Sequence, residues 1–204
     1  MAVLTISRQF GAGGITLGKM VSEKLGYHFY DEEIIQLVAK KAKVSKHWVE
    51  SMEKEAGGKF QRLISGLVSK SLIERILDDQ RGYIDEDIYV DLLHTVIRKI
   101  ADEGEAVIIG RGSQYILKDH KDASHVLLVA DKEHRIKFIE EHYNLSTDKA
   151  TRVVSTEEKK RTVLYRKFGK EDYDQPVHYH MVLNMNKTDL HTAVKLMCRL
   201  VTSK

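Results

Sequence analysis

The stretch Val3-Leu-Thr-Ile-Ser-Arg-Gln-Phe-Gly-Ala-Gly-Gly-Ile-Thr16 decides the fold, because it predicts a strand, a glycine loop and the start of a helix. Residues 2–6 form a short apolar run typical of a strand buried on both faces. From Ile15 the apolar residues recur at helical spacing, and Gly26 is placed to end the helix. Glycines at 11, 13 and 14 leave backbone N–H groups uncovered beside a helix N-terminus, where an anion is favoured. We therefore predict a phosphate-binding loop; the alternative is a tight glycine-rich turn.

The loop departs from the Walker A pattern, G-x-x-x-x-G-K-[ST]. If Gly13 is its second glycine, Gly14 stands where the lysine belongs, and Thr16 lies one place after the expected hydroxyl residue. We predict that Arg8, at the end of the strand, supplies part of the missing positive charge. We expect Lys19, a turn further along the helix, to point away from the loop.

A dinucleotide-binding loop is the competing interpretation. Its pattern, G-x-G-x-x-G, fails because the last position is Thr16 rather than glycine. Asp31 could nevertheless act as the acid that binds the ribose in such folds. A dinucleotide-dependent enzyme therefore stays as a third hypothesis.

Composition limits the class of protein. The 204 residues suit one domain, and a hydrophobic fraction of 42% supports a core. Lys and Arg exceed Asp and Glu by only three, so no global basicity indicates nucleic-acid binding, and no apolar run reaches membrane-spanning length. The single Cys198 excludes a multi-thiolate zinc site within the chain and is expected to pack in a helix. We expect a cytoplasmic protein without nucleic-acid or membrane partners; a homo-oligomer is left open.

The rest of the chain alternates strands with helices. We expect strands at 27–30, 106–109, 124–130 and 181–184, and helices at 87–102, 131–143, 146–167 and 187–201. This order predicts an α/β fold with a parallel sheet covered on both faces. Ligands of such sheets bind beyond the carboxyl ends of the strands, where the glycine loop, Asp31 and residues 110–113 would meet.

Two groups of charged residues are candidates for binding phosphate. Arg111 lies between two glycines directly after a buried strand, and an arginine fork suits a phosphate; alternatively it caps a carbonyl or pairs with a carboxylate. The second group, Glu157 to Arg161 with Arg166, lies on one charged helix, where Arg161 faces Glu157 at i+4. Such arginines close over the transferring phosphate in many phosphoryl-transfer enzymes, but a charged helix is also a common solvated surface.

With these residues together, the sequence resembles the cytidylate-kinase-like family, relatives of bacterial cytidylate kinases among the P-loop nucleoside monophosphate kinases. The resemblance covers nearly the whole chain. Its markers are the segments 5–14, 24–34, 107–113, 158–161 and 179–184. It implies a P-loop NTPase-like three-layer fold with about five parallel strands, a helical insertion and a helical lid. We expect a single domain over 1–204, an acceptor-side arm at 45–85 and a lid-like segment at 146–176.

The resemblance also implies roles for individual residues. ATP phosphates would bind at Gly11, Ala12, Gly13, Gly14, Ile15 and Thr16, and Thr16 would help to place Mg²⁺. Asp31, Arg111 and Glu158 would bind the acceptor, and Arg161 and Arg166 would act in catalysis. From the missing lysine of the loop, and not from the resemblance, we add Arg8 to the catalytic residues. The chain departs from true cytidylate kinases in having Glu158 for an aspartate and Val154 for an arginine, and His180 stands where many members of the family have an aspartate.

The predicted function is phosphoryl transfer from ATP to a nucleoside monophosphate, with CMP or dCMP as the acceptor. The main alternative is a binding or regulatory module that keeps the fold and has lost catalysis, which the absent lysine favours. The apolar segment 59–80 fits either an arm over the site or a surface for a partner.

Overall fold

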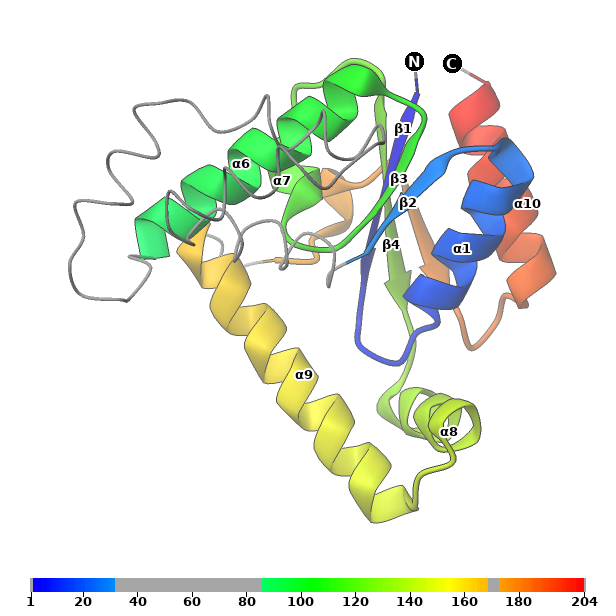
Figure 1. The fold of residues 1–204 in the computed structure, drawn as a ribbon. Helices are drawn as coiled ribbons and strands as arrows, with labels where there is room; N and C mark the ends of the chain where they lie inside the picture. The colour runs from blue at the N-terminus through cyan, green and yellow to red at the C-terminus, as the bar shows by residue number, and fades with distance from the viewer. Residues whose placement is uncertain (1, 32–85, 169–172, 204) are drawn as a thin grey trace, which may run out of the picture.

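The computed structural model describes residues 2–31, 86–168 and 173–203. Its centre is a five-stranded sheet in the spatial order β2-β3-β1-β4-β5, parallel at each pairing (Figure 1). The strands are β1 (Val3–Arg8), β2 (His28–Tyr30), β3 (Ala106–Ile109), β4 (Ala123–Val129) and β5 (Met181–Asn184). The prediction of an α/β fold with a parallel sheet of about five strands is therefore confirmed.

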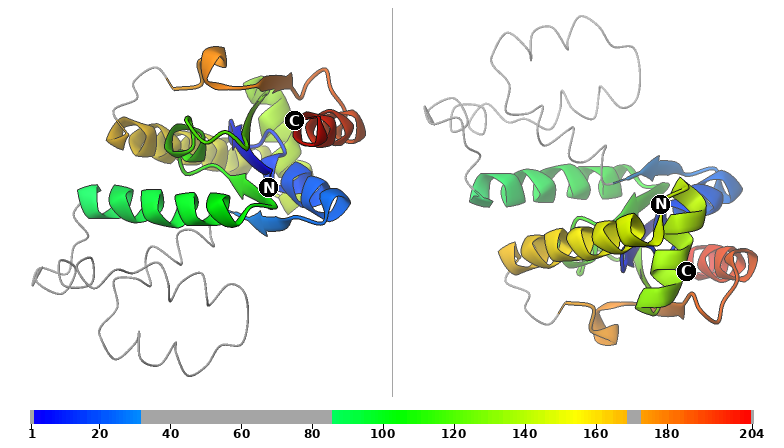
Figure 2. Two further views of the ribbon diagram at one scale, coloured as in Figure 1. Left: turned by 90° about the horizontal axis from the view of Figure 1, so that it is seen from above. Right: turned by 90° about the horizontal axis from the view of Figure 1, so that it is seen from below.

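Helices form layers on both faces of this sheet, as Figures 1 and 2 show. One face carries α1 (Gly14–Leu25) and α10 (Leu190–Thr202). The other carries α6 (Glu86–Glu103), the short α7 (Ser113–Ile116) and the end of α9 (Thr147–Lys167). A 3₁₀ turn, η1 (Pro176–His178), precedes β5. The helix α8 (Lys132–Tyr143) belongs to neither layer and packs with α9 beyond the carboxyl end of β4.

The alternation of side chains along β1 builds both apolar layers. Leu4 and Ile6 point into the layer with α1 and α10, while Val3 points into the layer with α6, and all three are fully buried. The central position of β1 between β3 and β4 explains this double burial. A smaller apolar cluster of Ile139, Ala150 and Val154, with Phe10 against it, joins α8 to α9. The glycine loop therefore begins beside this helix pair.

The strand boundaries differ from the prediction where polar residues continue the ladder. β1 extends to Arg8 rather than ending at Ile6, because Ser7 and Arg8 still pair with β4. Thr5 is tolerated inside the sheet because its hydroxyl lies 2.8 Å from Nδ1 of His125. Cys198 is buried in the layer of α10, as predicted.

The predicted insertion lies outside the described residues, and the predicted lid-like segment lies only partly within them. The insertion at 45–85 lies outside them, as does the 59–80 segment, so both stay predictions. The lid-like segment 146–176 includes α9, which begins after Ser146. Within the described ranges, no helix is long and apolar enough to cross a bilayer.

Candidate active site

The glycine loop presents unused backbone donors. Gly11 and Gly13 have positive φ angles of 89° and 80°, conformations that glycine adopts without strain. Among the residues that the structure describes, one loop amide is bonded to a carbonyl: the N–H of Ala12 donates to the carbonyl of Gln9 at 3.0 Å. Among the described residues, no hydrogen bond uses the backbone N–H groups at 11 and 13–16. Because three of these belong to the first turn of α1, they carry the helix's partial positive charge.

Arg8 lies across the loop in the space that a residue-14 side chain would need. A Cβ added at Gly14 would lie 2.8 Å from Cγ and 3.1 Å from Cδ of Arg8. A Cβ at Gly110 would lie 2.0 Å from Nη1 of Arg8, so the guanidinium rests on the backbone after β3. The side chain thus runs from the end of β1, past the loop, to the end of β3. This geometry explains why a lysine at position 14 would not fit beside Arg8.

Two cavities meet at this arginine. The loop cavity, about 360 Å³, lies between the glycine loop with α1 and the facing side of α8. Its lining includes Gly11, Gly13, Gly14, Ile15, Thr16, Lys19, Phe138, His142 and Tyr143. The edge cavity, about 460 Å³, lies beside it and is lined by Asp31, Arg111, Glu157, Lys160, Arg161, Leu164 and Tyr165. Arg8, Phe10 and Ile15 line both cavities. Lys19 is exposed and belongs to the lining of the loop cavity, and our expectation that it points away from the loop stays a prediction.

Arg111 reaches the edge cavity from an unusual turn. Gly110, Arg111 and Gly112 all have positive φ angles, of 68°, 56° and 70°. A positive φ at a residue with a side chain is uncommon and carries strain, which often marks a functional position. The turn buries Arg111 to 8% exposure, and the ring of Phe168 packs on Gly112, 2.7 Å from where a Cβ would lie. The structure thus brings Arg111 together with Arg8 and Asp31 at the carboxyl ends of β3, β1 and β2.

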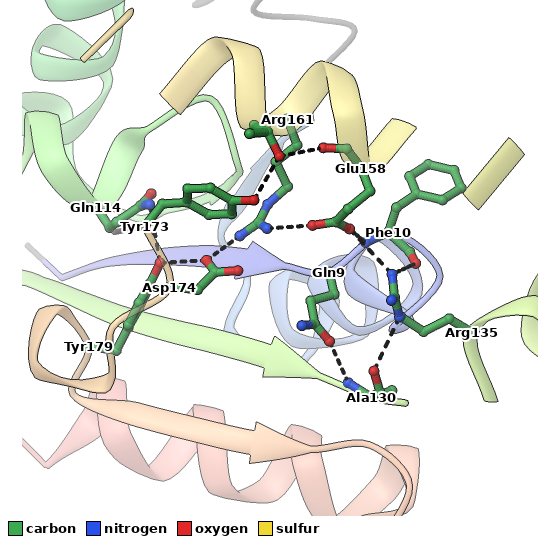
Figure 3. A network of polar contacts seen from close by, with 11 residues as sticks. Gln9, Phe10, Gln114, Ala130, Arg135, Glu158, Arg161, Tyr173, Asp174 and Tyr179 are labelled. Atoms are coloured by element: carbon green, nitrogen blue, oxygen red, sulfur yellow. Dashed lines mark hydrogen bonds and ion pairs between the residues drawn. The ribbon is translucent and has the colours of Figure 1, made fainter. Parts of the chain in front are cut away.

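Arg161 is held by the carboxylates of Glu158 and Asp174, which Figure 3 shows, and lies against two tyrosine rings. Its Nη1 donates to Oε1 of Glu158 at 3.0 Å, and its Nη2 pairs with Oδ1 of Asp174. The guanidinium lies 4.7 Å from the centre of the Tyr165 ring and 5.4 Å from that of Tyr173. Burial alone lowers the pKa of Arg161, but Tyr165, Asp174 and Glu158 raise it above its ordinary value, so the side chain stays charged.

The helix pairs its charges differently from the prediction. Arg161 pairs with Glu158 at i+3, and Glu157 pairs instead with Lys160, at 2.6 Å. The rotation of α9 therefore turns Glu157 toward the edge cavity and Glu158 toward the glycine loop. Glu157 therefore lines the edge cavity, whereas Glu158, which we predicted to bind the acceptor, is not part of that lining.

Glu158 instead accepts hydrogen bonds from three groups. Its Oε2 accepts from the backbone N–H of Phe10 at 3.2 Å and from Nη1 of Arg135 at 3.3 Å. Its Oε1 accepts from Arg161. Arg135 also donates to the carbonyls of Phe10 and Ala130, both at 3.2 Å. Glu158 and Arg135 therefore fasten the start of the glycine loop to α9 and α8 (Figure 3).

Two of the other predicted residues take positions that differ from the expected ones. Arg166 is exposed on α9 and is not part of the lining of either cavity, so its catalytic role stays a prediction. Ala12 is buried, and its N–H donates to the carbonyl of Gln9 at 3.0 Å. Its place among the phosphate-binding residues therefore stays a prediction.

Sequence reasoning missed Arg135 and Asp174. Arg135 was detectable, because it lies in the first turn of α8, the helix that follows β4, and so at the same carboxyl edge that singled out Arg111. Asp174 precedes η1 in an irregular segment, and its partnership with Arg161 spans 13 positions. No local pattern in the sequence indicates that contact.

Comparisons with known proteins identify the fold and the family of the chain. A solved structure of an uncharacterized protein from Eubacterium ventriosum ATCC 27560 aligns with a TM-score of 0.69 and 20% identity over 100% of both chains, which shows a shared fold. Shikimate kinase from Bacteroides thetaiotaomicron aligns with a TM-score of 0.48 and 12% identity over 98% of each chain. None of the curated protein sequences matched. The sequence model of the cytidylate kinase-like family matches residues 3–187, and the chain therefore belongs to that family, with its P-loop NTPase-like fold.

Proposed function

We propose that the chain transfers the γ-phosphoryl group of ATP to a nucleoside monophosphate, with CMP or dCMP as the acceptor. Membership of a kinase-like family supports phosphotransferase chemistry of this kind. The observation that carries the proposal is the pair of adjoining cavities that share Arg8. One offers the amides of a glycine loop for the donor, and the other offers room and charge for the acceptor.

The edge cavity suits a mononucleotide in size and in charge. Its volume of about 460 Å³ falls in the ordinary range for small-molecule sites. Four cationic side chains line it, those of Arg8, Arg111, Lys160 and Arg161, against the two carboxylates of Asp31 and Glu157. The excess of positive charge favours a phosphate, and the carboxylates are suited to hydroxyl or amino groups of a nucleoside.

The loop cavity provides donors for a polyphosphate without a Walker lysine. Within the described part of the chain, the backbone N–H groups at 11 and 13–16 have no hydrogen-bond acceptor. A side chain at Gly11 would collide with the carbonyl oxygen of Arg135, 2.7 Å from where its Cβ would lie. In this arrangement Arg8 supplies the cation at the boundary with the acceptor. Glycine at position 14 therefore leaves the space that the side chain of Arg8 fills.

A magnesium ion bound with ATP would neutralise charge on the donor phosphates. Thr16 fits a role in holding it, because its hydroxyl group is a hard oxygen ligand in the lining of the loop cavity. In the described part of the chain, no group of three His, Cys, Asp or Glu side chains could hold a metal. This fits Mg²⁺, which commonly takes one or two protein oxygens and completes its shell with phosphates and water.

The reaction asks for positioning and charge stabilisation more than for a covalent group on the protein. An oxygen of the acceptor phosphate forms a bond to the γ-phosphorus as the bond to the departing ADP oxygen breaks. Arg111 holds the acceptor phosphate, and Arg8 lies between acceptor and donor, where negative charge spreads. Arg161 contributes its charge from the side of α9, where it lines the edge cavity.

A panel assay tests the proposal: ATP consumption is measured with each common ribo- and deoxyribonucleoside monophosphate. We expect turnover with CMP and dCMP and its loss in Arg111→Ala, seen chiefly as a raised KM for the acceptor. Arg152→Ala is the matched control, an exposed arginine on α9 that is not part of either lining. Turnover equal in Arg111→Ala and Arg152→Ala would contradict the assignment of the acceptor site.

A nucleotide-binding module with little or no turnover is the second candidate. Gly14 in place of the lysine favours it, as does the neutralisation of Arg161 by Glu158 and Asp174. This candidate predicts saturable binding of ATP in calorimetry with no consumption of ATP in the same panel. Consumption that depends on a monophosphate excludes it.

A further inference from the structure

The backbone N–H and C=O of Phe10 are held by two charged residues of the flanking helices. Its N–H donates to Glu158 on α9 at 3.2 Å, and its C=O accepts from Arg135 on α8 at 3.2 Å. Glu158 and Arg135 also pair with each other at 3.3 Å. Figure 3 shows the two side chains converging on Phe10 from opposite helices. The glycine loop therefore enters its turn from a point fixed to α8 and α9.

The same carboxylate that holds the loop also holds the catalytic arginine. Oε2 of Glu158 takes the amide of Phe10, and Oε1 takes Nη1 of Arg161 at 3.0 Å. Arg161 lines the edge cavity and Phe10 lines both cavities, so this one side chain links donor and acceptor sites. Asp174 and the ring of Tyr165 fix the guanidinium from its other sides.

We propose that Glu158 is a positioning residue: it sets Arg161 at a fixed place relative to the phosphate loop. The inference rests on the proposed function. It concerns how a positive charge is placed beside the phosphates in a site that has no Walker lysine. A Walker lysine is placed by its own loop, whereas Arg161 comes from a helix about 150 positions later in the chain. A carboxylate bonded to both gives the arginine a defined position relative to the loop.

This role differs from a contact between Glu158 and the acceptor. A residue that binds the acceptor would have a free oxygen in the edge cavity, whereas both oxygens of Glu158 are bonded to protein groups. The carboxylate that lines the cavity is that of Glu157. We accordingly assign the contact with the acceptor nucleoside to Glu157 and the placement of Arg161 to Glu158. The helices are docked on the loop in this structure, so substrates meet a preformed arrangement of arginines.

Amide hydrogen exchange followed by NMR tests the link to the loop without any nucleotide. In Glu158→Ala, exchange at Phe10 should rise at least tenfold, because its acceptor is gone, while Glu158→Gln, which keeps one acceptor oxygen, should restore part of the protection. Glu157→Gln is the matched control and should leave exchange at Phe10 within twofold of wild type. Equal exchange at Phe10 in wild type, Glu158→Ala and Glu158→Gln would overturn the proposal. If Glu158→Ala does not fold, the comparison of Glu158→Gln with Glu157→Gln decides in the same way.

A mutant cycle tests the link to Arg161. Arg135→Ala and Arg161→Ala remove two residues that both pair with Glu158, and we expect their effects on ATP·Mg²⁺ affinity to be non-additive by at least fivefold. In a Glu158→Ala background the two effects should become additive. Additivity with Glu158 present would overturn the placement role. A protein that binds no nucleotide would refute the proposed function, while the exchange at Phe10 would still decide whether Glu158 fixes the loop.

Discussion

Replacing Gly14 by alanine should weaken ATP binding without weakening the fold. Position 14 is the first residue of α1, where alanine is favoured over glycine by roughly 0.5–1 kcal/mol. The new Cβ would lie 2.8 Å from Cγ of Arg8, closer than the two atoms can approach, so Arg8 has to leave its place across the loop. A hydrogen bond to a charged group contributes about 1.5–3 kcal/mol, so losing Arg8 from a phosphate should cost about ten- to a hundredfold in affinity.

Isothermal titration calorimetry with ATP·Mg²⁺, combined with thermal unfolding, measures both effects. The informative set is wild type, Gly14→Ala, Arg8→Ala and the double variant. If alanine acts by displacing Arg8, each single change has a similar cost, and the double variant is no worse than Arg8→Ala. If the Cβ instead obstructs the phosphate directly, the two costs add. Additive costs, or unchanged affinity in Gly14→Ala, would refute the reasoning about Arg8.

The converse experiment restores the Walker pattern. Arg8→Ala combined with Gly14→Lys puts an ammonium group on the loop and removes the side chain that excludes it. We expect about tenfold tighter ATP binding than in Arg8→Ala alone, from the charge-assisted contact that returns. In the presence of Arg8, Gly14→Lys should give no such gain, because the two side chains compete for one space.

Three further predictions concern stability and reactivity. Gly11→Ala should destabilise the fold by about 2 kcal/mol or more in urea unfolding, because φ is 89° and the Cβ would lie 2.7 Å from the carbonyl oxygen of Arg135; an unchanged midpoint would show that α8 moves freely away from the loop. Hydrogen bonds from Thr192 lower the pKa of Asp189, so its contribution as N-cap of α10 is present above the unfolded value, about 3.9, and is lost as pH falls through the lower folded value. The Tm difference between wild type and Asp189→Ala should therefore shrink below about pH 4, and a difference constant with pH would contradict this. Burial raises the pKa of the Cys198 thiol, so a thiol reagent should modify the native protein far more slowly than the urea-unfolded chain; equal rates would contradict the burial.

The elements of the fold could be predicted because their signals are local. The apolar run at 106–109 and the strand at 181–184 have the bounds that hydrophobic patterning predicts. Gly26 ends α1 in a left-handed conformation with its N–H bonded near the end of the helix, as its position after the last apolar residue indicated. β1 was predicted too short because ladder pairing continued through the polar Ser7 and Arg8, which hydrophobicity does not register.

The sheet topology predicted where the site lies, but not how the side chains from α9 are arranged in it. The rule that ligands bind beyond the carboxyl ends of parallel strands placed Arg8, Asp31 and Arg111 together, and the structure brings all three to the edge cavity. The rotation of α9 could not be predicted, because every residue of Glu157 to Arg161 is charged and no apolar stripe there fixes which face packs. The partner of Arg161, Asp174, and the pairing of Glu158 with Phe10 follow from tertiary contacts that leave no local pattern.

The central claim is that backbone amides of the glycine loop, with Arg8, hold a polyphosphate in the absence of a Walker lysine. The most direct measurement is a ¹⁵N–¹H NMR titration with a non-hydrolysable ATP analogue and Mg²⁺, reading each loop amide separately. We expect the largest shifts at the five unoccupied amides, at 11 and 13–16, and a smaller one at Ala12, whose N–H already donates to Gln9. Binding that shifts amides elsewhere and leaves these five in place would contradict the account.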